Sequence, residues 1–332
     1  MRRASLILLA LIACSKDAED KPAAPAPEVA KPTPAPPQQP DPWKHPDSEP
    51  LPDTGEMNLV ANHARVDKIC PKVVAPLFYR IEKNGKTSYI LGTRHISVGF
   101  AKMPKVVHDK LAAAKLAVLE TPPDDDKPTA DPKGPALSKQ LGPKLWGHYT
   151  ELVGHAIADY ADHMKPSGAA IGMIAFYEDP TETLDIEIER TAAKSKIPVR
   201  GLETSAFQDK LLDHIIDLRM LKATIENTKD RAELAKESQD DLGEYCAGTD
   251  KDPGMDAHMR QQLHDAGYSD AEMNAIDEQM VFARNRDWIP KLDKMLASGD
   301  VFIAVGADHL IGDKGVVALL KAQGYTVTRV AP

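Results

Sequence analysis

The stretch Val301–Gly315, VFIAVGADHLIGDKG, contains the features that decide the fold. Its first part, Val301 to Val305, is apolar and rich in β-branched residues, a pattern typical of a strand that is buried on both faces. The run ends at Gly306, and His309 follows three residues later, ahead of an amphipathic helix that should start near Asp313. Open α/β sheets bind ligands just beyond the carboxyl ends of their strands. The stretch therefore predicts an α/β fold with a titratable side chain at such an edge.

The same arrangement occurs near the other end of the globular part of the chain. There the apolar run Tyr89-Ile90-Leu91 leads into Gly92-Thr93-Arg94-His95. Glycine lacks a Cβ, so at both places the backbone can turn sharply and approach a ligand closely. The two Gly-x-x-His elements, each after a strand, are the central observation from the sequence.

Two further strand-like runs end in a carboxylate. Residues 116–119 precede Glu120, and residues 197–202 precede Glu203. If these strands share one sheet and one direction, His95, His309 and the two glutamates project into one crevice. Two imidazoles with one or two carboxylates suit zinc, manganese or cobalt, which lower the pKa of a bound water.

Each of these residues also has a simpler interpretation. His95 alone is compatible with an ordinary hydrogen-bonded loop histidine. Glu120 and Glu203 are each compatible with a helix cap or a salt-bridge partner. The hypothesis of a shared site depends on finding all of them at equivalent strand ends.

The remaining pattern predicts a sheet with parallel pairs, covered by helices and carrying a large helical insertion. Asn84-Gly85 lies between two strand-like runs, which is a strong hairpin signal. Because helices separate the other strands, parallel pairing is expected. The expected helices follow Pro104 and cover 135–176 with a break at 165–166, 181–196, 204–247, 253–296 and 314–323, before a closing strand at 325–330.

Composition and charge exclude some classes of function. The net charge of −9 opposes nucleic-acid binding, which requires a basic surface. Aromatic residues make up only 5% of the chain, so platforms for stacking bases or sugars are not indicated. We expect a protein that does not bind nucleic acid.

The N-terminus has the pattern of an export signal. Two arginines precede an apolar run that is too short to span a bilayer, and the run ends in Leu11-Ile12-Ala13-Cys14. This ending resembles the lipobox of bacterial lipoproteins, which implies cleavage before Cys14 and its lipidation; the alternative is an ordinary signal peptide. Ser15 after the cysteine favours, by the same resemblance, the outer membrane, with the protein facing the periplasm or the cell surface.

The expected organisation is a signal peptide at 1–13, a lipidated cysteine with a tether at 14–52, and a single α/β domain at 53–332. The tether is rich in proline and alanine and has no periodic apolar face, so it cannot bury enough surface to fold. Its prolines should keep it extended. Cys70 and Cys246 remain, and in an exported protein they either form a disulfide or stay as two free thiols.

The ordered motifs resemble the TraB/PrgY/GumN family, which includes the animal Tiki proteins. The matching segments run from about Cys70 to Val330; they are Leu91-Gly92-Thr93-Arg94-His95, Ala117-Val118-Leu119-Glu120, Gly201-Leu202-Glu203-Thr204, Arg284-Asn285 before Trp288, Val305-Gly306-Ala307-Asp308-His309-Leu310-Ile311-Gly312 and Gly324-Tyr325-Thr326-Val327. One position departs from the family pattern. Arg94 stands where the family usually has an apolar residue, so we expect it to face solvent or to add a cation to the crevice.

The resemblance implies a fold and several functions. The fold is similar to that of erythromycin esterase and of haem-binding ChaN-like lipoproteins. Tiki proteins are regarded as metal-dependent proteases, and their paired motifs and glutamate correspond here to His95, His309 and Glu120. Other members are associated with pheromone shutdown or with polysaccharide gene clusters.

We therefore expect a lipid-anchored, metal-dependent hydrolase of the cell envelope that acts on a peptide or another small substrate. His95, His309 and Glu120 would bind the metal, and Glu120 is also the candidate general base. Glu203 would orient a ligand, and Arg284 would hold a substrate carboxylate or an oxyanion, or else form a structural salt bridge. The alternatives are a lipoprotein that binds a peptide or haem without catalysis, and an inactive scaffold.

Overall fold

The computed structural model describes residues 55–121, 134–249, 254–255 and 257–331. Within it, six strands form one sheet in the order β4-β3-β5-β2-β1-β6. The strands are β1 (Phe78–Lys83), β2 (Lys86–Thr93), β3 (Leu116–Leu119), β4 (Val199–Gly201), β5 (Val301–Gly306) and β6 (Thr326–Arg329). Strands β4, β3, β5 and β2 are parallel, whereas β1 is antiparallel to β2 and β6. The predicted mixed α/β sheet is confirmed.

The hairpin between β1 and β2 has the predicted two-residue turn. Lys83 pairs with Lys86, so only Asn84 and Gly85 connect the strands. Both have positive φ values, 52° and 73°. This is the geometry of a type I′ turn, which asparagine and glycine tolerate better than other residues.

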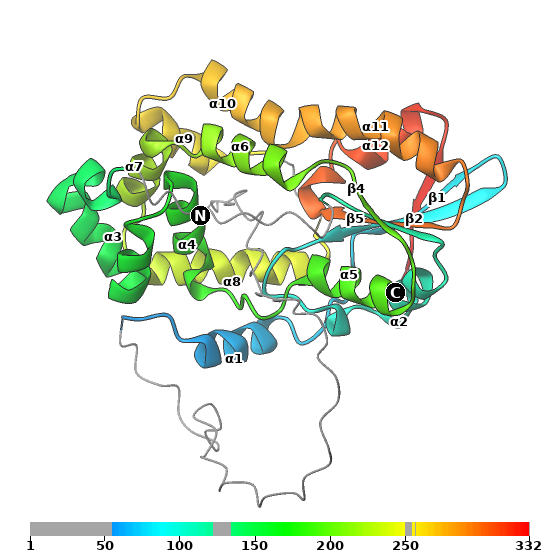
Figure 1. Cartoon of the computed structure of the whole chain (residues 1–332), viewed down its shortest axis with the longest axis horizontal. Coiled ribbons are helices and arrows are strands. Elements are labelled where there is room, and N and C mark those ends of the chain that lie inside the picture. Colours follow the sequence, from blue (N-terminus) through cyan, green and yellow to red (C-terminus); the bar gives the residue numbers. More distant parts are fainter. Residues whose placement is uncertain (1–54, 122–133, 250–253, 256, 332) are drawn as a thin grey trace, which may run out of the picture.

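Helices cover both faces of the sheet (Figure 1). One face packs against α1 (Leu59–Ile69), α2 (Lys105–Ala112), α5 (Leu184–Lys194) and α8 (Arg231–Ala247), and the other against α11 (Ala283–Leu296) and α12 (Val316–Ala322). Strand β5 contributes side chains to the apolar cores on both faces of the sheet. Phe302 and Ala304 belong to the core on the first face, and Ile303 and Val305 belong to the core on the second. The apolar run that opened the sequence analysis is therefore buried on both sides, as its composition predicts.

The expected helical insertion forms a lobe beside the sheet (Figure 1). It contains α3 (Leu137–Ala161), α4 (Pro166–Ile174), α6 (Ser205–Ile215), α7 (Leu218–Asn227), α9 (Ala257–Asp265) and α10 (Asp270–Asp277). Short turns complete the chain: η1 (Phe100–Lys102), η2 (Ala175–Tyr177), η4 (Ala307–His309) and the π-helical turn η3 (Glu278–Phe282). The lobe has its own apolar core, which includes Leu152, Met173 and Ile225.

The long helix expected at 204–247 is three helices. Asp217 and Asp230 interrupt it, because each side chain accepts a hydrogen bond from the backbone N–H three residues later and so starts a new helix. The segment 253–296 is likewise divided, and Ser269 and Glu272 form a capping box at the start of α10. Helix α1 was not expected, although Asn58 caps its N-terminus.

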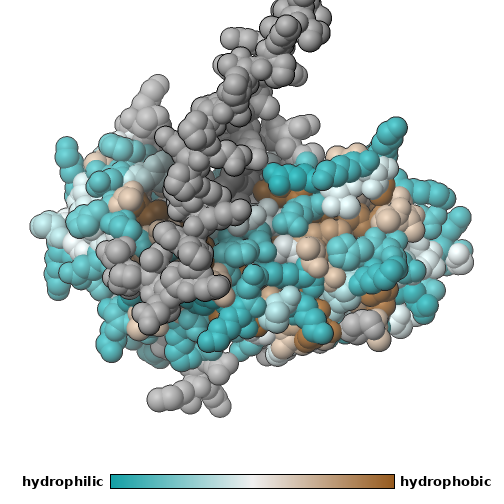
Figure 2. Space-filling model, turned by 90° about the horizontal axis from the view of Figure 1, so that it is seen from below, coloured by the Kyte–Doolittle hydropathy of each residue, from teal (hydrophilic) through white to brown (hydrophobic). Residues whose placement is uncertain are grey.

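In the part of the chain that the structure describes, no helix combines the length and apolar character needed to cross a bilayer. The face drawn in Figure 2 is mainly hydrophilic, with apolar side chains interspersed in small patches. The expected signal peptide, Cys14 and the expected tether lie outside the described residues.

Candidate functional site

The four predicted strand ends meet at one edge of the sheet. Thr93 of β2 pairs with Gly306 of β5, and Leu119 of β3 pairs with Gly201 of β4, so these parallel strands end at the same edge. A fifth side chain enters this edge from α11. We call the resulting group the strand-end cluster; its members are His95, Glu120, Glu203, Arg284 and His309.

Arg284 lies at the centre of the strand-end cluster. Its Nε donates to Glu203 at 2.9 Å, and its Nη1 faces the Met280 carbonyl at 2.9 Å and His309 Nε2 at 3.1 Å. Its Nη2 donates to Glu120 at 2.7 Å and also to Glu203. A guanidinium has five N–H donors, and all five are used here. Arg284 therefore organises the two glutamates and His309, and it has no free donor for a substrate carboxylate.

Glu120 is buried beneath this arginine. Its Oε1 accepts the backbone N–H of Gly306 at 2.6 Å, and its Oε2 accepts Gln208 Nε2 at 3.1 Å as well as Arg284. Burial alone would raise the pKa of Glu120, but the charge of the Arg284 guanidinium outweighs it and holds this pKa well below its usual range. Glu120 is thus a carboxylate, and its Oε1 retains one lone pair.

His309 is held as a neutral imidazole. Its ring lies 4.4 Å from the Trp288 ring, and its Nδ1 is 2.7 Å from Asn285 Oδ1. Arginine only donates, so His309 Nε2 accepts from Arg284 and Nδ1 donates to Asn285. Burial, with the charge of Arg284, lowers the pKa of His309 to about 3 against the opposing effect of Glu120.

His95 has the opposite environment. Its Nδ1 is 2.7 Å from Asp185 Oδ2 on α5, and the hydroxyl of Thr93 donates to the other oxygen of Asp185 at 2.8 Å. Burial alone would lower the pKa of His95, but Asp185 and Glu120 outweigh it and raise this pKa to about 9. The His95 side chain is also 15% exposed. It is therefore an imidazolium at neutral pH and can reach a ligand.

Because Gly306 has no side chain, it leaves a space between Glu120, His95 and His309. A Cβ at Gly306 would lie 3.1 Å from Glu120 Oε1, 3.4 Å from His95 Nε2 and 3.5 Å from His309 Cδ2. A side chain would therefore press against the Glu120 carboxylate, and the absence of a Cβ leaves the space beside Glu120 Oε1 and His95 Nε2 open. The glycine of the second Gly-x-x-His element thus has a direct role in the geometry of the site.

The strand-end cluster contains donors that divalent metals use, but it does not arrange them around one point. Among the described residues, only His63, Asp67 and Glu182 bring three donor atoms within 4.8 Å of one another, so the predicted ligands do not. His309 Nε2 already accepts from Arg284, and a metal at His95 would have to displace the Nε2 proton. As they are arranged, these side chains do not fit a divalent metal.

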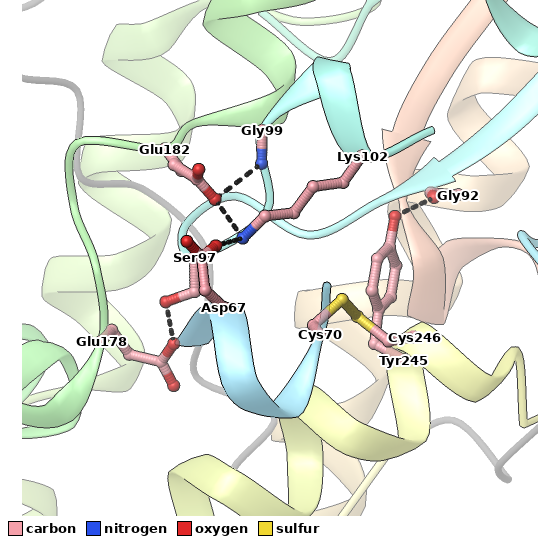
Figure 3. The surroundings of a disulfide bond; sticks show 10 residues. All are labelled: Asp67, Cys70, Gly92, Ser97, Gly99, Lys102, Glu178, Glu182, Tyr245 and Cys246. Atoms are coloured by element: carbon pink, nitrogen blue, oxygen red, sulfur yellow. Dashed lines mark hydrogen bonds and ion pairs between the residues drawn. A yellow bond between two sulfur atoms is a disulfide. The ribbon is translucent and has the colours of Figure 1, made fainter. Parts of the chain in front are cut away.

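The group of His63, Asp67 and Glu182 already contains a cation. The Lys102 ammonium lies 2.9 Å from Asp67 and 2.6 Å from Glu182 (Figure 3). A metal ion would have to displace this buried ammonium, so we interpret the group as an ion-pair network that joins α1 to the segment ahead of α5.

The two cysteines, for which the sequence left two possibilities open, are joined in a disulfide. Cys70 follows α1 and Cys246 lies near the end of α8, with a Cα–Cα distance of 5.8 Å (Figure 3). The neighbouring Tyr245 donates its hydroxyl to the Gly92 carbonyl at 2.9 Å. The disulfide therefore anchors a helix that contacts the backbone of the first Gly-x-x-His element.

Arg94 does not face solvent. Its side chain is 8% exposed, and its Nη2 donates to Glu178 at 2.8 Å. Glu178 also accepts from Ser97 and Ser238. The charge of Arg94 is thus balanced by the buried carboxylate of Glu178, which directly follows η2.

Sequence reasoning missed three residues that complete the site: Asp185, Asn285 and Gln208. They lie on α5, α11 and α6. Asp185 binds His95, Asn285 binds His309, and Gln208 donates to both Glu120 and Glu203. Asn285 directly follows Arg284 in one of the quoted motifs, which was the one available signal. Asp185 and Gln208 lie in ordinary amphipathic helices and give no such signal.

Comparison with known proteins agrees with the ordered motifs. Residues 77–329 match the model of the TraB/PrgY/gumN family. Searches among curated proteins and among solved structures found no match. The matched range contains every member of the strand-end cluster.

Proposed function

The chain belongs to the TraB/PrgY/gumN family, and from this premise we propose that it is a hydrolase that cleaves a peptide bond or a related acyl bond at the strand-end cluster. The observation that carries the proposal is the pair of polar atoms above Gly306. His95 Nε2 and Glu120 Oε1 face the same small space, and one is a proton donor while the other is an acceptor. Paired groups whose pKa values are driven apart are typical of acid–base catalysis.

In this proposal, Glu120 Oε1 orients the attacking water and accepts its proton. The water oxygen bonds to the carbonyl carbon, and the bond to the leaving nitrogen or oxygen breaks. His95 donates its Nε2 proton to the leaving group, and the proton on Glu120 returns to His95 after the products leave. Asp185 holds the imidazolium in place, while Arg284 fixes Glu120 and His309 without contacting the substrate.

The test uses the full chain and a mixture of fluorogenic peptides. His95→Gln and Glu120→Gln should each lower kcat/KM by about 100-fold or more, the range for removing an acid or base. His148→Gln is the matched control, because His148 lies in the helical lobe on α3 and bonds only the Thr228 carbonyl and Glu151. Full activity in His95→Gln would overturn the proposal.

A metal-dependent hydrolase is the second candidate. Both imidazoles are held through Nδ1 by an oxygen acceptor, Asp185 or Asn285, as metal-binding histidines commonly are. This candidate requires Arg284 to release His309. Stoichiometric manganese, cobalt or zinc in the wild type, lost in a His95→Ala/His309→Ala variant, would favour it. A Soret band on haem addition would instead favour the haem-binding alternative.

We also propose that the protein acts from a lipid anchor at Cys14 in the outer membrane of the cell envelope. The support is the apolar leader, the lipobox-like ending and the extended tether in the sequence. Labelling of cells with a clickable fatty acid tests this directly. Cys14→Ser should abolish labelling, and labelling that persists in this variant would exclude lipidation at Cys14.

A further inference from the structure

The mechanism above supplies an acid and a base, but no donor for the carbonyl oxygen of the bond that breaks. When water attacks a carbonyl group, negative charge develops on this oxygen, and hydrolases commonly stabilise it with preorganised N–H or O–H donors. Arg284 does not serve this purpose, because its donors are used within the strand-end cluster. Such donors must therefore come from another element at the same edge of the sheet.

Helix α6 begins at this edge. It follows β4, and the connection between them runs beside the general base, because the N–H groups of Leu202 and Glu203 donate to the Glu120 carbonyl at 2.9 and 2.8 Å. Ser205, the first residue of the helix, comes two residues after Glu203. One turn later, Gln208 reaches Glu120 and Glu203 with its Nε2. The first turn of α6 thus lies against the strand-end cluster.

The hydroxyl of Ser205 has no partner on this face of α6. Ser205 is 8% exposed, yet its hydroxyl forms no hydrogen bond within the part of the chain that the structure describes. Residues three apart share a helix face, so Ser205 lies on the face from which Gln208 contacts the two glutamates. The Cα–Cβ bonds of a helix tilt toward its N-terminus, which directs this hydroxyl toward the strand ends. Buried hydroxyl groups are normally hydrogen-bonded, so this one indicates a place for a ligand.

Two backbone donors lie beside this hydroxyl. The first N–H groups of a helix have no acceptor within the helix. Thr204 caps α6 by accepting from the Phe207 N–H, and among the described residues nothing accepts from the N–H groups of Ser205 and Ala206. The positive end of the helix dipole lies at the same point. The first turn of α6 therefore presents donors from the side chain and from the backbone to an oxygen that carries negative charge.

We propose that the first turn of α6 binds the carbonyl oxygen of the bond that is cleaved, with the Ser205 hydroxyl and the N–H groups of Ser205 and Ala206 as donors. Ser205 forms no covalent bond; it stabilises the negative charge while Glu120 accepts the proton of water and His95 protonates the leaving group. The catalytic role rests on the proposed hydrolase. Binding of a tetrahedral anion at this turn does not, because it is measured without turnover.

The kinetic test uses variants of the full chain and the fluorogenic peptides that the wild type cleaves. Ser205→Ala should lower kcat by about 100-fold, the loss typical of removing one oxyanion donor, and leave KM within about twofold. Ser205→Thr keeps a hydroxyl and should recover most of the loss. Because the Ser205 hydroxyl has no partner in the free protein, Ser205→Ala should leave Tm unchanged, whereas loss of a structural hydrogen bond would lower it. Ser138→Ala, in the first turn of α3 in the helical lobe, is the matched control.

The binding test is an NMR titration of the full chain labelled with ¹⁵N-alanine. Dimethylphosphinate is a tetrahedral monoanion, and acetone is its neutral, planar counterpart. The phosphinate should shift the Ala206 N–H signal and bind there at least about tenfold more tightly than acetone. Ala232 is the internal control, because it is the second residue of α8 as Ala206 is of α6. An equal shift at Ala232 would reflect only the general attraction of helix ends for anions and would overturn the proposal.

The outcomes separate this inference from the proposed function. Hydrolysis with an unchanged kcat in Ser205→Ala would overturn the role of α6 and leave the hydrolase in place. If no hydrolysis is found, a phosphinate shift at Ala206 that Ser205→Ala abolishes would support the anion-binding turn while the hydrolase fails. A lower Tm in Ser205→Ala, with a loss of kcat that Ser205→Thr does not recover, would show that the hydroxyl is structural and would overturn the proposal.

Discussion

The two Gly-x-x-His elements look alike in the sequence and differ in the folded protein. At the end of β2, His95 is partly exposed and faces Asp185, which helps to raise its pKa to about 9. At the end of β5, His309 is buried, faces Arg284 and Asn285, and has a pKa lowered to about 3. One element therefore presents a proton donor at neutral pH and the other a neutral acceptor.

The difference teaches that the motif places a histidine but does not set its charge. The charge depends on which helix packs over each strand end. Helix α5 brings a carboxylate to His95, and α11 brings an arginine and an amide to His309. Substituting these partners on α5 and α11 should therefore reduce the difference in pKa between His95 and His309 while leaving the sheet intact.

Arg284→Met should have the largest effect. It leaves Glu120 and Glu203 buried without their cation, which typically costs about 3–5 kcal/mol. The measurement is the free energy of unfolding in urea. Arg286→Met, which breaks an exposed pair between α11 and Glu278 of η3, should cost less than about 1 kcal/mol. Equal losses in the two variants would show that the strand-end cluster contributes little to stability.

Removing the disulfide should come next. Cys70→Ser/Cys246→Ser frees the ends of α1 and α8 and should cost about 2–5 kcal/mol of unfolding free energy. Because Tyr245 contacts the Gly92 carbonyl, amide exchange should increase at the end of β2 and remain unchanged at the end of β5. Comparable changes at both strand ends would contradict this one-sided anchoring.

Asp185→Asn should bring the two histidines closer together in pKa. It removes the charge that raises the pKa of His95, which should fall from about 9 toward the ordinary value of 6.5. NMR titration of the imidazole signals measures both histidines in one experiment. Asp109→Asn, in an exposed pair with Lys105 on α2, is the control and should leave His95 unchanged. A His95 pKa that stays near 9 in Asp185→Asn would exclude Asp185 as its cause.

The pH dependence of stability should also separate the two histidines. Between pH 6.5 and about 3 the unfolded state protonates His309 while the native state does not, so stability should fall as pH falls. Between pH 6.5 and about 9 the native state keeps the His95 proton that the unfolded state loses, so stability should fall as pH rises. The measurement is the free energy of unfolding in urea across this pH range. His309→Gln should reduce the loss of stability below pH 6.5 and leave the loss above pH 6.5 unchanged. If His309→Gln instead reduced the loss of stability above pH 6.5, the raised pKa would belong to His309 and not to His95.

Local sequence determined the strands and the residues at their ends. Apolar β-branched runs and the Asn84-Gly85 turn are short-range signals that predicted the strands, and the helices between the strands predicted parallel pairs. Together they indicated the edge where His95, Glu120, Glu203 and His309 meet. They also predicted the apolar run of β5, because burial on both faces leaves a continuous apolar composition. These features depend on neighbours along the chain, so they can be read from it.

Only the tertiary structure decided what those side chains are paired with. Asp185, Asn285 and Gln208 reach the site because α5, α11 and α6 pack over the strand ends, and helical periodicity alone does not give that orientation. The protonation of His95 and His309 follows from burial and from charges that are distant in the sequence. The sequence by itself thus determined which groups gather at the edge, and packing determined their charge, their partners and whether they can hold a metal.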